Sequence, residues 1–138
     1  RNPFFVRPWQ HVLEPLRGYL MLGAVLLAGE HHSAEAWNFG PSDEAMVPVR
    51  AFTEGFLEAW GTGRCRNASN AEDFPETEHL ILDSTKAAER LGWTPDLSLN
   101  DGIDLTADWY QRVLSRGELA FEVTMEQISD YFDTAQTL

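Results

Sequence analysis

The sequence predicts a helix-rich α/β fold with a few short strands, in a chain of 138 residues that is long enough for one domain. Several stretches have apolar residues at the 3.6-residue spacing of helices, and three short apolar runs are typical of strands. Three such short strands make a poor sheet by themselves, so we expect them to extend a sheet whose other strands lie elsewhere. Because the first residue is Arg rather than Met, we expect the chain to be the C-terminal part of a larger α/β protein.

The first half of the chain is predicted to contain two strands and two helices. Prolines on both sides of the first apolar run favour a strand there, because a residue before proline is biased away from helix. Apolar residues at helical spacing then define two helices, and the first of them tolerates Pro15 only in its first turn. The predicted strands are Phe4–Val6 and Ala36–Phe39, and the predicted helices are His11–Leu27 and Val47–Trp60.

The second half is predicted to contain a loop, a strand and three helices. Residues 64–78 are polar and lack periodicity, which favours a long loop. Ser98 and Asp101 have the spacing of a capping box and mark the start of one helix, and Thr124 and Gln127 have the same spacing before the last helix. The predicted strand is His79–Leu82, and the predicted helices are Lys86–Leu91, Ser98–Leu114 and Met125–Phe132.

Charge is distributed unevenly along the chain. Ten basic residues against 22 acidic ones give a net charge of −12, which argues against non-specific binding to nucleic acid or to an anionic membrane. Residues 1–20 nevertheless contain three arginines and one glutamate. An anionic ligand is therefore expected near this segment, with clustering by chance as an equal alternative. The longest apolar stretch, Tyr19–Ala28, has about half the length of a membrane span, so no membrane partner is expected.

The single cysteine, Cys65, excludes a disulfide within this sequence and a thiolate metal site. We therefore expect a reducing, cytoplasmic setting. The adjacent histidines His31 and His32 lie near Glu30 and Glu35. Neighbouring side chains in one loop do not converge on a metal ion without a particular turn, so no metal site is expected.

Three segments together resemble one enzyme family. Residues 1–20 contain Arg-Asn-Pro-x-x-Val-Arg-Pro-Trp-Gln-His-Val-Leu-Glu-Pro-Leu-x-Gly-Tyr-Leu, residues 36–41 read Ala-Trp-Asn-Phe-Gly-Pro, and residues 80–95 contain Leu-x-Leu-Asp-Ser-x-Lys-Ala-x-x-x-Leu-Gly-Trp-x-Pro. This combination resembles the C-terminal part of the extended short-chain dehydrogenase/reductase enzymes that act on nucleotide sugars. The first segment is most similar to the form found in CDP-glucose 4,6-dehydratases.

The resemblance implies a fold and an activity for a whole enzyme. It implies a Rossmann domain that carries NAD, with the sugar nucleotide held between that domain and a smaller C-terminal domain. Residues 1–138 would then be a single substrate-binding portion, and the NAD-binding Rossmann domain would be absent from this chain. The implied reaction is that of a lyase, which converts CDP-glucose to CDP-4-keto-6-deoxyglucose for polysaccharide synthesis.

The same resemblance implies that this chain does not catalyse the reaction alone. The sequence has neither a glycine-rich NAD motif nor a Tyr-x-x-x-Lys pair, so we assign it no catalytic and no NAD-binding residue. Two alternatives stay open, namely a non-catalytic nucleotide-sugar-binding or interaction module and the tail of a related epimerase. The expected partners are a nucleotide sugar, above all CDP-glucose, and the missing Rossmann domain, and a homo-oligomer stays open.

Five residues are candidates for substrate binding. The resemblance implies that Arg7 contacts the pyrophosphate, whereas its spacing alone leaves an ion pair with a carboxylate as the alternative. Trp9 would share the face of Arg7 on a strand, where it contacts the ligand or belongs to the core. Gln10 and His11 lie where strand becomes helix, and they either reach the ligand or stabilise that junction. Glu76 matches the acid of the family's His-Glu-Ala motif, which here reads Pro-Glu-Thr. It either accepts hydrogen bonds from hydroxyl groups of the ribose or the sugar, or is a solvated loop carboxylate.

Overall fold

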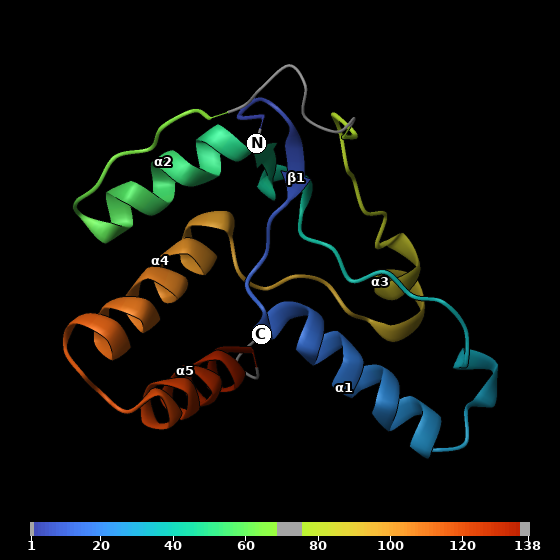
Figure 1. Cartoon of the computed structure of the whole chain (residues 1–138). Helices are drawn as coiled ribbons and strands as arrows, with labels where there is room; N and C mark the ends of the chain where they lie inside the picture. Colours follow the sequence, from blue (N-terminus) through green and yellow to red (C-terminus); the bar gives the residue numbers. More distant parts are fainter. Residues whose placement is uncertain (1, 69–75, 136–138) are drawn as a thin grey trace.

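The computed structural model describes residues 2–68 and 76–135, and Figure 1 shows how their elements are arranged. An extended segment that contains strand β1 runs through the middle of the molecule. Helices α2, α4 and α5 lie on one side of it, and helices α1 and α3 lie on the other. The helices are α1 (Leu13–Leu27), α2 (Val49–Trp60), α3 (Thr85–Leu91), α4 (Leu99–Tyr110) and α5 (Ala120–Ala135), and a π-helical turn (Gln111–Ser115) extends α4.

The predicted fold class is confirmed, because short strands accompany a structure that is mostly helical. Strand β1 (Val6–Pro8) pairs with β2 (Met46–Pro48) in antiparallel register, so that Arg7 lies opposite Val47. Val6 also forms an isolated parallel bridge with His79. Three extended segments from distant parts of the sequence therefore meet at β1.

Most of the predicted strand positions are wrong. Strand β1 begins two residues later than the predicted Phe4–Val6, and β2 is not predicted at all. Residues 36–39 form no strand, and of these four residues only Phe39 is buried, with its ring edge-to-face against Trp93 and 5.1 Å between the ring centroids. The predicted strand His79–Leu82 is reduced to the single bridge at His79. Short apolar runs therefore do not by themselves indicate pairing here, and Leu80 and Ile81 of the last run are also exposed.

The helix predictions are more accurate than the strand predictions. Helix α1 begins at Leu13, so Pro15 lies in its first turn, as expected. The predicted capping box of α4 is confirmed, because Ser98 Oγ accepts from the Asp101 N–H while Asp101 Oδ2 accepts from the Ser98 N–H. Helix α2 ends at Gly61, whose φ of 85° places it in the left-handed region that favours glycine.

The predicted start of the last helix is wrong. Helix α5 begins at Ala120, and Thr124 and Gln127 therefore lie inside the helix rather than at its start. Their side chains join α5 to α4 instead. Trp109 Nε1 donates to Thr124 Oγ1 at 2.9 Å, and Gln127 Nε2 donates to the Leu105 carbonyl oxygen at 2.9 Å.

A buried cluster of polar groups connects α1 to the rest of the molecule. Glu14 is 1% exposed, and its Oε1 accepts from the backbone N–H groups of Asp96 and Leu97 at 3.1 and 2.7 Å. Arg17, one turn further along α1, forms an ion pair with Asp96 at 3.0 Å and donates to the Tyr131 hydroxyl at 2.9 Å. These contacts attach α1 to the segment after α3 and to α5.

The described part of the chain contains no helix with both the length and the apolar character that crossing a membrane requires.

Candidate functional site

The fold brings Arg7 and Glu76 together beside β1. Arg7 Nη2 lies 2.7 Å from Glu76 Oε1. Arg7 Nη1 donates to the carbonyl oxygens of Val6 and Thr77, at 2.7 and 3.0 Å. The guanidinium carbon lies 5.6 Å from the centroid of the Phe5 ring. These contacts orient the planar guanidinium before any ligand binds.

The pair of Arg7 and Glu76 is suited to binding a polar ligand. The two side chains are 17% and 35% exposed, so both are partly in contact with solvent. Ion pairs near the surface contribute only about 1 kcal/mol or less, and a phosphate can therefore compete with the carboxylate for the guanidinium. Phosphate oxygens accept two parallel hydrogen bonds from arginine. The carboxylate of Glu76 can in turn accept hydrogen bonds from hydroxyl groups.

Trp9 and Gln10 have mainly protein partners. The Trp9 ring stacks on Phe52 with 4.0 Å between centroids, and its Nε1 donates to the Val47 carbonyl oxygen at 3.1 Å. Gln10 Nε2 donates to the Phe39 carbonyl oxygen at 2.7 Å, whereas its buried Oε1 accepts no hydrogen bond from the described residues. Both side chains connect the end of β1 to its neighbours. Their contact with a substrate stays a prediction.

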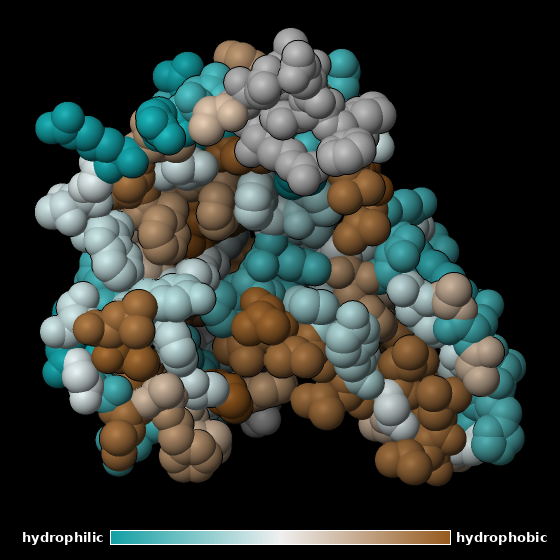
Figure 2. Space-filling model, viewed as in Figure 1, coloured by the Kyte–Doolittle hydropathy of each residue, from teal (hydrophilic) through white to brown (hydrophobic). Residues whose placement is uncertain are grey.

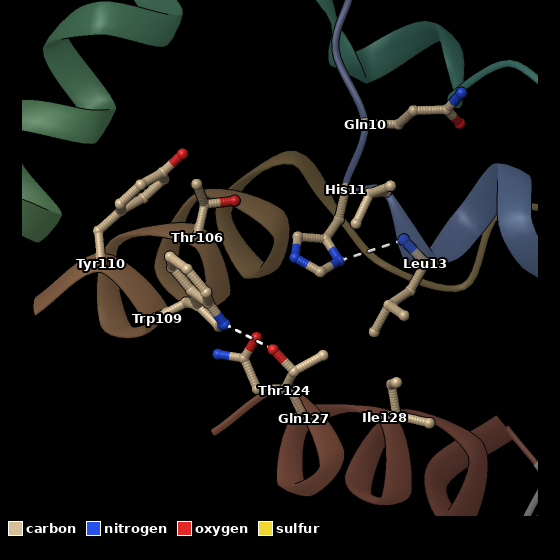
Figure 3. Close-up of a pocket in the computed structure, with 10 residues that line it drawn as sticks. Gln10, His11, Leu13, Thr106, Trp109, Tyr110, Thr124, Gln127 and Ile128 are labelled. Carbon is tan, nitrogen blue, oxygen red and sulfur yellow. Dashed lines mark hydrogen bonds between the residues drawn. The ribbon is translucent and has the colours of Figure 1, made fainter. Parts of the chain in front are cut away.

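His11 lies apart from Arg7 and faces a cavity of about 400 Å³ between α1, α4 and α5 (Figure 3). Its Nδ1 accepts a hydrogen bond from the Leu13 N–H at 3.4 Å, so the neutral ring carries its proton on Nε2. In Figure 3 this second nitrogen points across the cavity toward the side chains of α4. Burial lowers the pKa of His11, which keeps the ring neutral at pH 7.

The residues around this cavity come from segments that are distant in the sequence. Trp109 and Thr106 belong to α4, and Gln127 and Ile128 belong to α5 (Figure 3). The spacing of Thr124 and Gln127 indicates a helix cap, so the sequence does not predict that these residues line a cavity. A usable signal is the Trp109 ring, since the indole N–H of a partly buried tryptophan usually needs an acceptor.

The described residues do not fit NAD or a metal ion. The diphosphate of NAD is usually bound where a strand leads through a glycine-rich turn into a helix. Strand β2 leads directly into α2 at Val49, and it is antiparallel to β1. Among the same residues, no group of three or more His, Cys, Asp or Glu side chains is placed to hold a metal ion.

Several known proteins are similar to this chain, although no family model matches it. The chain is 35% identical over 131 residues, or 95% of its length, to CDP-glucose 4,6-dehydratase of Salmonella typhimurium. It is 34% identical over 102 residues, or 70% of its length, to GDP-L-fucose synthase 1 of Arabidopsis thaliana. It is 30% identical over 106 residues, or 77% of its length, to dTDP-glucose 4,6-dehydratase of an Actinoplanes species.

The fold and these similarities define the class of the protein: the chain belongs to the family of nucleotide-sugar dehydratases and epimerases, as a C-terminal part. Within this family, the similarity to CDP-glucose 4,6-dehydratase extends over nearly the whole chain. The chain spans about a third of the length of these curated relatives, namely 36%, 30% and 31%.

Proposed function

We propose that this chain is the nucleotide-sugar-binding part of a 4,6-dehydratase that acts on CDP-glucose. The observation that carries the proposal is the Arg7 guanidinium, which the Val6 and Thr77 carbonyl oxygens hold beside the Glu76 carboxylate. The similarity to the Salmonella enzyme supports CDP-glucose as the substrate, because it covers 95% of the chain. The whole enzyme is then a cytoplasmic lyase that supplies deoxysugars for polysaccharides.

The shared chemistry of the relatives supports Arg7 as a ligand of the diphosphate. The names of the three relatives contain CDP, GDP and dTDP, so the base differs while a nucleoside diphosphate joined to a sugar is common to all. A guanidinium recognises the diphosphate and not the base. Arg7 therefore provides affinity for the class of ligand, and other contacts select the base.

We assign to Glu76 the role of accepting hydrogen bonds from hydroxyl groups of the ribose or the sugar. A diphosphate that binds Arg7 is itself anionic, and two anions close together repel each other. The Glu76 carboxylate is therefore stable next to the ligand only where it faces hydroxyl donors. Trp9 and Gln10 hold the strand that carries Arg7, and His11 completes the junction between that strand and α1.

This proposal makes residues 1–138 one substrate-binding portion without catalytic residues of its own. The described residues do not fit NAD, so we derive no reaction step through the cofactor. In the whole enzyme, NAD and the groups that transfer protons belong to a separate Rossmann domain.

The first test replaces Arg7 by Ala and measures the binding of CDP-glucose by calorimetry. Hydrogen bonds to charged groups contribute about 1.5–3 kcal/mol each, so we expect the Kd to rise at least tenfold. Arg90→Ala is the matched control. Arg90 also pairs with a carboxylate, with 2.5 Å between its Nη1 and Glu35 Oε1, but it lies on α3 rather than on β1. An unchanged Kd in Arg7→Ala would refute the assignment.

A second titration separates recognition of the diphosphate from recognition of the base. CDP-, GDP- and dTDP-glucose are titrated against the unmodified chain and against Arg7→Ala. We expect the substitution to weaken all three by a similar factor, because the diphosphate is common to them. If the unmodified chain prefers the GDP sugar, the tail of a GDP-sugar enzyme replaces CDP-glucose dehydratase as the assignment.

A further inference from the structure

The cavity beside His11 lies apart from the pair of Arg7 and Glu76. It has a volume of about 400 Å³, and its described lining residues come from the segment that leads into α1, from α4 and from α5. Neither Arg7 nor Glu76 is among them. Sites for small molecules in proteins have volumes of about 300–1,000 Å³, and apolar cavities of about 150 Å³ already bind benzene. The cavity is therefore large enough for a small aromatic molecule.

The walls of this cavity are uncharged. None of the ten described residues that line it is an aspartate, glutamate, lysine or arginine. Burial lowers the pKa of His11, so its ring is neutral at pH 7. Figure 2 shows apolar colouring on the surface where Figure 1 places the start of α1, which borders the cavity. An ion would lose its hydration here without gaining a partner of opposite charge, so the cavity is suited to an uncharged ligand.

Two polar side chains of α4 have their donors occupied within the protein. Trp109 Nε1 donates to Thr124 Oγ1 at 2.9 Å, and Thr106 Oγ1 donates to the Gly102 carbonyl oxygen at 2.7 Å. The first bond also joins α4 to α5 and holds the indole ring at the cavity. Neither donor therefore needs a ligand.

His11 differs because its free donor points into the cavity. Its Nδ1 accepts from the Leu13 N–H, so the proton of the neutral ring is on Nε2, which points across the cavity in Figure 3. Within the described part of the chain, this N–H donates to no acceptor. A Cβ on Gly102 would lie 3.4 Å from His11 Cβ, so His11 packs closely on α4. A ligand that displaces water from this N–H must offer it an acceptor.

We propose that this cavity is a binding site for a small uncharged aromatic molecule that carries one hydrogen-bond acceptor. The acceptor binds the His11 Nε2–H, and the ring packs against the Trp109 indole, as aromatic rings do in stacked or edge-to-face pairs. Leu13 and Ile128, whose side chains point toward each other in Figure 3, provide further apolar contact. This inference does not rest on the role of Arg7.

The test uses three probes on the whole protein as its natural gene encodes it. Acetophenone has an aromatic ring and a carbonyl acceptor, isopropylbenzene has nearly the same shape without an acceptor, and benzoate carries a charge. We expect acetophenone to bind with saturation, and nuclear Overhauser effects from its ring protons to Trp109 and Ile128 to place it in the cavity. We expect benzoate to bind at least about tenfold more weakly, because its charge finds no partner.

One substitution closes the cavity, and a matched one does not. We expect Thr106→Phe to abolish the binding of acetophenone, because the added ring occupies the cavity. Thr53→Phe is the control, since Thr53 also lies on a helix, α2, and its Oγ1 also donates to the carbonyl oxygen four residues earlier at 2.7 Å, but it does not line this cavity. The nuclear Overhauser effects come from the unmodified protein, so they decide the question if a variant does not fold.

A second substitution tests the hydrogen bond. His11→Phe keeps a ring and removes the N–H, so we expect it to raise the Kd of acetophenone about fivefold and to leave that of isopropylbenzene nearly unchanged. Arg7→Ala should leave the affinity for acetophenone unchanged, so a failure of the proposed function is distinguishable from a failure of this inference.

Three results would overturn the inference. The first is acetophenone that does not saturate the protein or shows no nuclear Overhauser effect to Trp109. The second is a lack of selectivity, in which Thr53→Phe weakens binding as much as Thr106→Phe, His11→Phe weakens both neutral probes equally, or benzoate binds as tightly as acetophenone. The third is displacement of acetophenone by CDP-glucose, because the cavity then belongs to the nucleotide-sugar site.

Discussion

The ion pair that Arg7 forms in the structure is compatible with the role of diphosphate ligand that we propose for it. Its guanidinium pairs with the Glu76 carboxylate, and both side chains are partly exposed to solvent. The two roles are compatible because a partly exposed ion pair contributes little to folding. The charge of Arg7 is therefore available to a ligand at a small cost to the protein.

At the scale of single residues, we also expect His11 to make the stability of the chain depend on pH. Burial lowers its pKa below 6.5, so between the two values the unfolded chain binds more protons than the folded chain. The contribution of neutral His11 is complete above pH 6.5 and is lost as the pH falls through its folded pKa. We expect the free energy of unfolding, measured in urea, to decrease as the pH falls below 6.5.

Replacing His11 should weaken the dependence of the free energy of unfolding on pH. His11→Asn removes the titrating group and keeps an acceptor near the Leu13 N–H. His31→Asn is the matched control, because His31 is exposed in the turn after α1. If the free energy of unfolding changed equally with pH in both variants, His11 would not be the source of the pH dependence.

At the scale of elements, two glycines of α1 should respond oppositely to alanine. A Cβ on Gly18 would lie 2.4 Å from the Phe39 ring, whereas a Cβ on Gly23 would meet no atom within 4 Å. Overpacking costs about 1–3 kcal/mol, so Gly18→Ala should lower the free energy of unfolding. Gly23→Ala should raise it by about 0.5–1 kcal/mol, because alanine favours helix. Urea unfolding of the 138-residue chain measures both, and changes of equal sign would refute the packing of Phe39 on α1.

Helix α5 illustrates how contacts between elements override a local signal. Thr124 and Gln127 have the spacing of a capping box, but the helix begins at Ala120 and uses both side chains to contact α4. The hydrogen bonds to Trp109 and Leu105 satisfy polar groups at the interface of two helices. The same two residues therefore determine how α5 borders the cavity beside His11.

At the scale of the whole molecule, Arg17 holds three segments together. It joins Glu14 and Asp96 through charge, and it donates to Tyr131, whose pKa burial raises to about 12. Removing one partner of a buried ion pair leaves an uncompensated charge, here that of Glu14, at a cost of about 3–5 kcal/mol. We expect Arg17→Ala to lower the free energy of unfolding in urea by about 3 kcal/mol or more.

The control for this prediction is an arginine in an exposed pair. Arg50 Nε lies 2.7 Å from Glu54 Oε1 on the surface of α2, with side-chain exposures of 63% and 58%. Solvent screens such a pair, so Arg50→Ala should leave the free energy of unfolding nearly unchanged. If both substitutions lowered the free energy of unfolding equally, the buried polar cluster around Arg17 would not hold α1, α5 and the segment after α3 together.

The sequence by itself determined the features that depend on residues within one or two helical turns of each other. The capping box of Ser98 and Asp101, the early Pro15 in α1 and the end of α2 at Gly61 are of this kind. Such interactions are local, and their energies do not depend on distant segments. The similarity to nucleotide-sugar dehydratases is also readable from sequence, since its motifs are continuous.

Only the tertiary structure decided which distant residues meet. Strand β2 exists because β1 is there to pair with it, and His79 makes a single bridge for the same reason. The contact of Arg7 with Glu76 and the position of His11 beside the cavity likewise depend on how separate segments pack. Pairing and burial are properties of both partners, and the pattern of one segment contains no information on where the other will lie.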